Sequence, residues 1–178
     1  MSTAFARTRR RKYRYGADDI SLLIKDLANP DAVVRETARE ALVAIGKPAV
    51  PALIDALSNP HRQARWEAAK ALDCLRDPAA APALAAALGD EDHGVAWLAA
   101  EAVIDLGCDG LEAVLKALFH PGNAFWCREG AHHVIHELMK KERAGWLLPV
   151  LEALDDPDPG LAVPPAALRA LRAMNASR

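Results

Sequence analysis

The chain has 178 residues and a formal net charge of -2 at pH 7, a length that suits one domain with a substantial core. Hydrophobic residues make up 52% of it, but aromatic residues only 5%, and much of the remainder is alanine. We therefore expect closely packed small helix surfaces rather than a thick sheet core. No run approaches the roughly 18 consecutive apolar residues of a membrane-spanning helix, so we expect no membrane association.

The first 16 residues differ in charge from the rest of the chain. They hold six basic side chains and no acid: Arg7, Arg9, Arg10, Arg11, Lys12 and Arg14. The remaining 16 basic and 24 acidic residues give the body a net charge of -8. The sequence thus predicts a basic N-terminal arm over 1–16 and an acidic body over 17–178.

Three cysteines occur, Cys74, Cys108 and Cys127, with no CxxC pair and no apolar signal segment before them. An odd number of isolated cysteines is typical of reduced thiols, so we expect a cytoplasmic protein.

A 16-residue segment recurs along the chain. It reads LANPDAVVRETAREAL from Leu27, LSNPHRQARWEAAKAL from Leu57 and LGDEDHGVAWLAAEAV from Leu88, at spacings of 30 and 31 residues. A looser fourth copy starts at Leu118. A fixed period of this size predicts a solenoid.

Each copy reads as a helix, a turn rich in Asn, Pro, Asp and Gly, and a second helix. The expected first helices lie near 18–28, 48–58, 79–88, 109–119 and 143–155. The expected second helices lie near 31–45, 61–75, 93–106, 124–140 and 164–175. The last pair, within 142–178, is degenerate because DDPDPGLAVPP interrupts the pattern.

The pattern L-x-D/N-x-D-x-x-V-R-x-x-A-A-x-A-L resembles the short HEAT-like repeats first associated with phycobilisome lyases. The match is carried by residues such as Leu27, Val34, Arg35, Ala38 and Leu42 in the first copy and their counterparts in the next two. The resemblance implies an all-α, right-handed α-solenoid of about five helix pairs, in which the second helices line a concave groove. Such repeats serve many unrelated functions, so the fold alone does not name one.

A projection at 100° per residue separates a core stripe, including Ala38, Leu42, Ala68 and Leu72, from the residues expected to line the groove. The groove residues are Glu36, Arg39, Trp66, Lys70, Asp73, Trp97, Glu101, Ile104, Glu129, His133 and His136. Trp66, Trp97 and Ile104 form an apolar centre within a charged rim, a composition typical of a protein-binding patch. The alternative is that both indole rings lie flat over neighbouring helices and are buried.

Arg35 and Arg65 are expected to be structural, each pairing with an acidic turn of its own or a neighbouring repeat.

The segment AHHVIHEL at 131–138 is the candidate for metal chemistry. Glu129 and His132 make an E-x-x-H pair with His136 one turn further, and His120 and Cys127 lie nearby in sequence. A metal site needs three or four converging ligands, and no second helix offers a matching row. The HEAT-repeat metalloenzyme deoxyhypusine hydroxylase relies on several His-Glu pairs, whereas this chain has one. We therefore expect no metal and no cofactor.

These observations favour a non-enzymatic adaptor or assembly subunit that binds another protein in the groove. One alternative is a chromophore-lyase-like subunit that handles a bilin. Another is a protein that binds nucleic acid, or an acidic partner, through the basic arm, with Tyr13 and Tyr15 as stacking groups.

Overall fold

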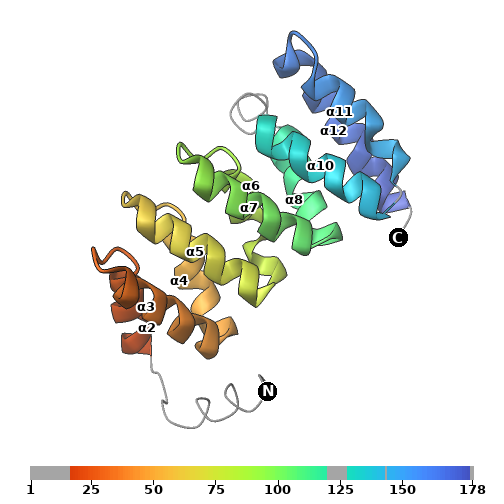
Figure 1. Ribbon diagram of the computed structural model, residues 1–178. Helices are drawn as coiled ribbons and strands as arrows, with labels where there is room; N and C mark the ends of the chain where they lie inside the picture. Colours follow the sequence, from red (N-terminus) through yellow and green to blue (C-terminus); the bar gives the residue numbers. More distant parts are fainter. Residues whose placement is uncertain (1–16, 120–127, 143, 177–178) are drawn as a thin grey trace.

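The computed structural model describes residues 17–119, 128–142 and 144–176, which contain ten α-helices and no strand (Figure 1). The helices form five pairs along the chain, as the repeat predicts. They are α2 (Ala17–Asp26) and α3 (Ala32–Ile45), α4 (Val50–Ala56) and α5 (Arg62–Leu75), α6 (Ala81–Ala87) and α7 (His93–Asp105), α8 (Cys108–Phe119) and α10 (Arg128–Glu142), and α11 (Leu148–Leu154) and α12 (Pro159–Ala176).

Short 3-10 turns lead into three of the first helices, at Lys47–Ala49, Pro78–Ala80 and Gly145–Leu147. None of the described helices is long and apolar enough to cross a membrane.

The helix boundaries follow from local chemistry. The Asp31 side chain caps α3 by accepting a hydrogen bond from the Val33 amide at 2.9 Å, and Asp92 caps α7 through the Val95 amide at 3.1 Å, so each satisfies a donor that the first turn leaves open. Prolines such as Pro51 stand at the first helical positions, where a missing N–H costs little.

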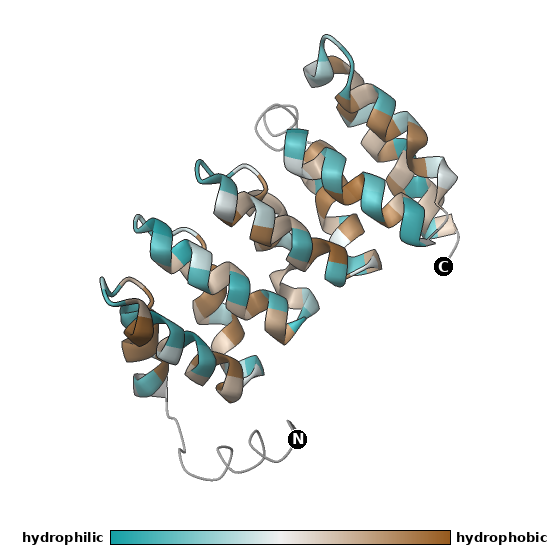
Figure 2. Ribbon diagram, viewed as in Figure 1, coloured by the Kyte–Doolittle hydropathy of each residue, from teal (hydrophilic) through white to brown (hydrophobic). Residues whose placement is uncertain are grey.

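The second helices α3, α5, α7 and α10 pack one against the next and form one layer, at the front of Figure 1. The first helices α2, α4, α6 and α8 form the layer behind it. Figure 2 shows brown, hydrophobic residues between the layers and teal, hydrophilic residues on the outer surface of the front helices. The structure is thus an all-α solenoid, as predicted.

The fifth pair exchanges the two layers. Helix α11 packs against α10, and α12 packs against α8 and α11, so the first helix of this pair extends the front layer and the second extends the back layer. Helix α12 also begins at Pro159 and contains Pro164 and Pro165, although the sequence predicts a start near residue 164. That prediction is wrong, because burial of residues such as Val163 and Ala167 against neighbouring helices holds the helix through the two prolines.

Alanine and leucine fill the core at the predicted positions. Ala38, Leu42, Ala68 and Leu72 are all at most 2% exposed. The small side chains let helices approach closely, and a Cβ added at Gly110 in α8 would lie 2.1 Å from the Val103 carbonyl oxygen in α7.

Candidate protein-binding face

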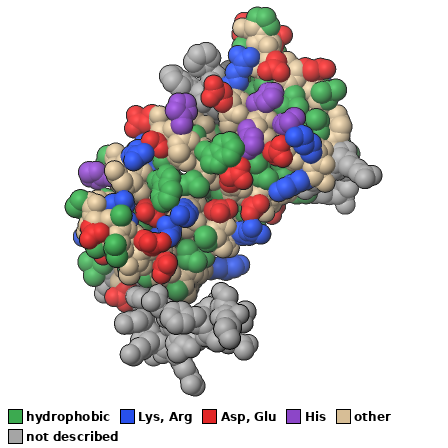
Figure 3. Space-filling view, in the orientation of Figure 1, with side chains coloured by type: hydrophobic (Ala, Val, Ile, Leu, Met, Phe, Trp, Pro, Cys, Tyr) green, Lys and Arg blue, Asp and Glu red, His purple; other side chains and the backbone are tan. Residues whose placement is uncertain are grey.

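The outward surface of α3, α5, α7 and α10 is the candidate site, and we call it the second-helix face. Its solvent-accessible members among the predicted groove residues are Glu36, Trp66, Lys70, Asp73, Trp97, Glu101, Glu129, His133 and His136. Figure 3 views this side of the molecule and shows apolar side chains near the middle, with acidic, basic and histidine side chains around them.

Trp97 is the largest exposed apolar side chain in the described residues. The residue is 57% exposed, and its indole stacks on the His133 imidazole of α10 with ring centroids 4.8 Å apart and planes inclined by 26°. His133 Nε2 lies 3.2 Å from Glu101 Oε1, one turn along α7 from Trp97. The imidazole therefore fixes one side of the indole while more than half of Trp97 remains open to a partner.

Trp66 occupies the equivalent position in α5 but is partly buried. A Cβ added at Gly94 would lie 3.6 Å from Trp66 Cδ1 and 3.7 Å from Nε1, so the edge of the indole lies against the first turn of α7. Lys70 Nζ stands 4.7 Å from the ring centroid, a cation–π contact. Trp66 is therefore partly buried against the neighbouring helix, whereas Trp97 is exposed on the surface.

Carboxylates gather toward the C-terminal ends of α5 and α7. The pKa of Asp73 is raised by partial burial first, then by the negative charge of Asp105, and to a smaller extent by Glu101, against the opposing effect of Arg76. Arg76 and Lys141 both pair with Asp105. This part of the second-helix face therefore carries crowded negative charge that is only partly neutralised.

Two of the predicted groove residues are not available to a partner. Ile104 is 6% exposed and belongs to the hydrophobic core, so it does not extend the apolar centre. Arg39 is 9% exposed, and its Nη1 donates to Glu67 Oε2 at 2.9 Å while Nη2 lies 3.3 Å from Glu36 Oε1. These two predictions are wrong because a helical projection gives the direction of a side chain but not what the adjacent helix places over it.

Glu67 is a structural residue that the repeat pattern does not single out. It is 4% exposed and pairs with Arg39 and, at 3.7 Å, with Arg35, both on the preceding repeat. The signal in the sequence is an acid in an otherwise alanine-rich row of α5, with two arginines one repeat earlier. A buried carboxylate shared by two guanidinium groups fixes how α3 and α5 sit against each other.

Arg65 and Arg35 are structural, as predicted. Arg65 makes a bidentate contact with the next repeat: Nε donates to Asp90 Oδ2 at 2.7 Å and Nη2 donates to Asp90 Oδ1 at 3.0 Å. It also donates to the Asn59 carbonyl at 3.0 Å, and Arg35 donates to the Asn29 carbonyl at 2.8 Å in the same way. The hydrogen bond to Asp90 raises the pKa of Arg65, which stays charged.

Each histidine of α10 lies next to a different carboxylate. His132 and His136 stack with ring centroids 6.3 Å apart. His132 Nε2 is 3.6 Å from Asp155 Oδ2, and His136 Nδ1 is 3.5 Å from Glu137 Oε1. Among the residues that the structure describes, no three His, Cys, Asp or Glu residues converge as metal ligands. His120, Cys127 and the basic arm lie outside those residues.

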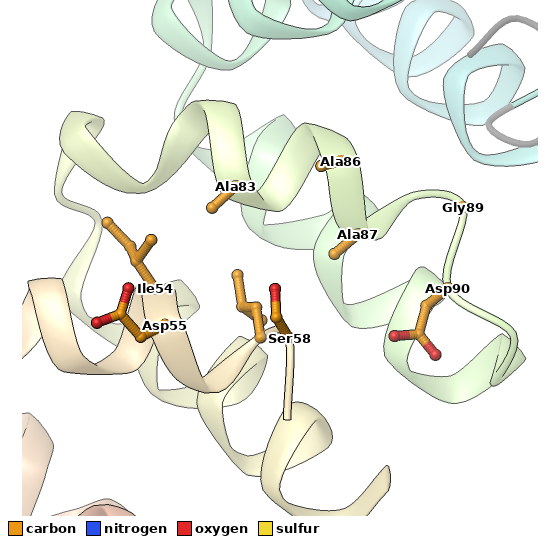
Figure 4. Close-up of a pocket in the computed structure, with 9 residues that line it drawn as sticks. Ile54, Asp55, Ser58, Ala83, Ala86, Ala87, Gly89 and Asp90 are labelled. Carbon is orange, nitrogen blue, oxygen red and sulfur yellow. The ribbon is translucent and has the colours of Figure 1, made fainter. Parts of the chain in front are cut away.

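A cleft of about 400 Å³ lies in the other layer, between α4 and α6. Ile54 and Ser58 face Ala83 and Ala87 across it (Figure 4). It exists because the alanines of α6 are too short to fill the space against α4. The Asp90 carboxylate on its rim is already bound to Arg65, which leaves few polar groups to orient a small molecule.

Comparison of the sequence with protein families agrees with this architecture of paired helices, buried alanine rows and arginines that contact the next repeat. A family model described as HEAT repeats matches residues 20–107. The protein is a HEAT-like repeat protein. HEAT repeats generally mediate protein–protein interaction.

No curated protein matches this HEAT-like chain. Among solved structures, it is similar to an engineered protein whose crystal structure came from a structural genomics consortium, with 20% sequence identity and a TM-score of 0.42. That alignment covers 88% of this chain and 79% of the other.

Proposed function

We propose that this HEAT-like protein is a non-enzymatic adaptor or assembly subunit that binds another protein through the second-helix face. The observation that carries the proposal is Trp97, which is 57% exposed on a rigid helix and held in one orientation by His133. A preoriented tryptophan loses little side-chain entropy on binding, and tryptophan is enriched among residues that dominate binding energy.

The surroundings of Trp97 support the same use. Trp66 adds a second, partly exposed ring on the adjacent helix α5, and Lys70 of the same helix lies over this ring. Glu36, Glu101 and the crowded Asp73 supply charge around the two rings. An apolar centre with a charged rim excludes water at the middle of an interface and sets its register at the edge.

The test compares Trp97→Ala with Leu161→Ala in the full chain. Both changes remove a large exposed apolar side chain, but Leu161 lies on α12 in the other layer and is 77% exposed. Tagged proteins are used to capture partners, and the melting temperature of each variant checks that the fold is retained. We expect Trp97→Ala to lose partners that the wild type and Leu161→Ala both keep. Equal capture by all three proteins would reject the second-helix face as the binding surface.

A further inference from the structure

Charged side chains connect the second helices of successive pairs, and their chemistry changes along the chain. Between α3 and α5, Arg39 Nη1 donates to Glu67 Oε2 at 2.9 Å. Between α5 and α7, Arg62 Nη1 donates to Asp92 Oδ2 at 3.1 Å. Because an arginine side chain does not lose its proton in proteins, the cation at these two junctions does not depend on pH.

The junction between α7 and α10 uses a histidine instead. In α7, Ala96 occupies the position that Arg35 and Arg65 hold in α3 and α5. From the side of α10, His133 Nε2 lies 3.2 Å from Glu101 Oε1 of α7. Among the described residues this is the shortest contact between charged groups that joins the two helices.

The same imidazole also contacts Trp97, so one side chain of α10 meets two residues of α7. Its ring is stacked on the indole with centroids 4.8 Å apart, and Glu101 follows Trp97 by one turn of α7. We call Trp97, Glu101 and His133 the α7–α10 contact. The side chains of His133 and Glu101 are both partly exposed, so the imidazole can exchange a proton with water.

A proton on His133 strengthens both parts of the α7–α10 contact. An imidazolium forms an ion pair with the Glu101 carboxylate, whereas the neutral ring forms a hydrogen bond without the second charge. A cation is also attracted to the face of an indole. Histidine is the side chain whose charge ordinarily changes between about pH 5 and pH 8. The added stability is therefore present at the acidic end of this range and is lost as the pH rises.

Other charged groups on α10 and on the elements packed against it mostly have partners of their own. Glu137 pairs with Lys140 on α10, Asp105 of α7 with Lys141, Glu112 of α8 with Lys116, and Asp155 after α11 with His132.

The charges closest to the α7–α10 contact favour a proton on His133. The pKa of Glu137 is lowered by Lys140 first, and to a smaller extent by His136 and His133, so Glu137 is a second carboxylate that attracts the imidazolium. Asp73 of α5 adds negative charge near Glu101, and Glu129 lies one turn before His133 on α10. The opposing cations are His136 and Lys140, of which Lys140 is paired.

We propose that the α7–α10 contact is a pH-sensitive junction of the solenoid, in which protonated His133 holds α10 firmly to α7 and neutral His133 lets the two helices separate more often. Because His133 also orients Trp97, the packing of that indole follows the same proton. The proposal concerns the isolated chain and does not rest on the proposed function.

Amide hydrogen exchange in the full chain tests the junction. Protection factors are compared at about pH 5.5 and about pH 8, after correction for the pH dependence of exchange in an unfolded peptide. We expect amides of α10 to be about fivefold better protected at the lower pH, the size that one partly exposed ion pair can supply. Amides of α3, which lies two helices before α7 in the layer, should change much less. No rise in α10, or an equal rise in α3, would overturn the proposal.

A matched pair of variants assigns the effect to one carboxylate. Glu101→Gln keeps an acceptor for His133 but removes the charge, so the rise in α10 protection at low pH should largely disappear. Asp155→Asn makes the same kind of change beside His132 and should keep the rise. A full rise in Glu101→Gln, or an equal loss in both variants, would contradict the assignment to His133 and Glu101.

The indole N–H resonance of Trp97 reports on the other half of the contact. In a proton–nitrogen spectrum it should move between about pH 5.5 and about pH 8 in the wild type, because the ring stacked on it changes charge. In His133→Gln the resonance should stay nearly fixed, while the melting temperature at the higher pH remains close to that of the wild type. A resonance that moves equally in both proteins would show that the indole does not follow the proton on His133.

Discussion

The two tryptophans of the second-helix face occupy the same position in successive repeats, but one is partly buried and the other is exposed. Trp66 lies beside Gly94 in the first turn of α7, and a Cβ added there would be in ordinary van der Waals contact with the indole, 3.6 Å from Cδ1. Trp97 instead meets the His133 ring of α10 and stays 57% exposed. The sequence predicts that the two rings share a row, but their exposure depends on which residues of the next helix face them.

Glu67 gives the sharpest stability prediction for a single residue. Changing Glu67 to Ala leaves the buried Arg39 without its 2.9 Å partner, and removing one member of a buried ion pair typically costs about 3–5 kcal/mol. We expect a loss of about that size in the free energy of unfolding, measured by urea denaturation. Glu36→Ala removes the exposed partner of the same arginine and should change it by less than about 1 kcal/mol. A similar small effect for both variants would show that the buried pair does not hold α3 against α5.

The raised pKa of Asp73 predicts that the effect of replacing this residue on stability depends on pH. Its raised pKa means that the folded state binds the proton more tightly than the unfolded chain does. The stability that protonation confers is therefore present below the ordinary aspartate pKa and is lost as the pH rises through the raised value. We expect Asp73→Asn to be more stable than the wild type at neutral pH, with the difference shrinking as the pH falls through and below about 4.

Urea unfolding at several pH values measures this difference, and Asp55→Asn, an exposed change on α4, serves as the control. If Asp73→Asn were less stable than the wild type at neutral pH, the carboxylate would be contributing favourable contacts that outweigh its burial and its acidic neighbours.

At the scale of helices, the end of α5 carries a backbone cost that the first and third repeats avoid. Arg76 adopts a left-handed conformation with φ of 49°, where the first and third repeats have Gly46 and Gly107 at φ of 81° and 58°. Arg76 compensates by pairing with Asp105 in the next repeat. Glycine takes this conformation without steric cost, whereas other residues do not.

We therefore expect Arg76→Gly to be about 1 kcal/mol more stable than Arg76→Ala, because both lose the ion pair but only alanine keeps the strained backbone. Thermal or urea unfolding of the two variants measures this. An alanine variant as stable as the glycine variant would mean that the end of α5 relaxes without strain.

The helix boundaries show which local sequence signals are sufficient to predict where a helix begins and ends. Caps such as Asp31 and Asp92 and the first-turn prolines bring the first seven helices close to their predicted ranges. Helix α12 departs from its prediction because Pro164 and Pro165 favour a helix boundary locally, while packing of α12 on α8 and α11 overrides them. The exchange of layers in the fifth pair depends on long-range packing, which no local pattern specifies.

For the whole molecule, the 30-residue period predicts the solenoid and the buried rows, because each repeat can bury its apolar stripe only against its neighbours. The same period predicts most of the second-helix face. It does not predict that Ile104 is covered or that Arg39 turns inward to Glu67, because both depend on contacts between repeats whose side chains differ.

The anchoring role of Trp97 is tested most directly by the affinity of a captured partner for the wild type, Trp97→Ala and Trp66→Ala, measured by calorimetry with purified proteins. We predict that Trp97→Ala weakens binding by about 2 kcal/mol, roughly thirtyfold, while its melting temperature stays near that of the wild type. Trp66→Ala should lower the melting temperature, since its ring packs against α7. A Trp97→Ala variant that binds the partner as tightly as the wild type would show that the exposed indole does not anchor the interface.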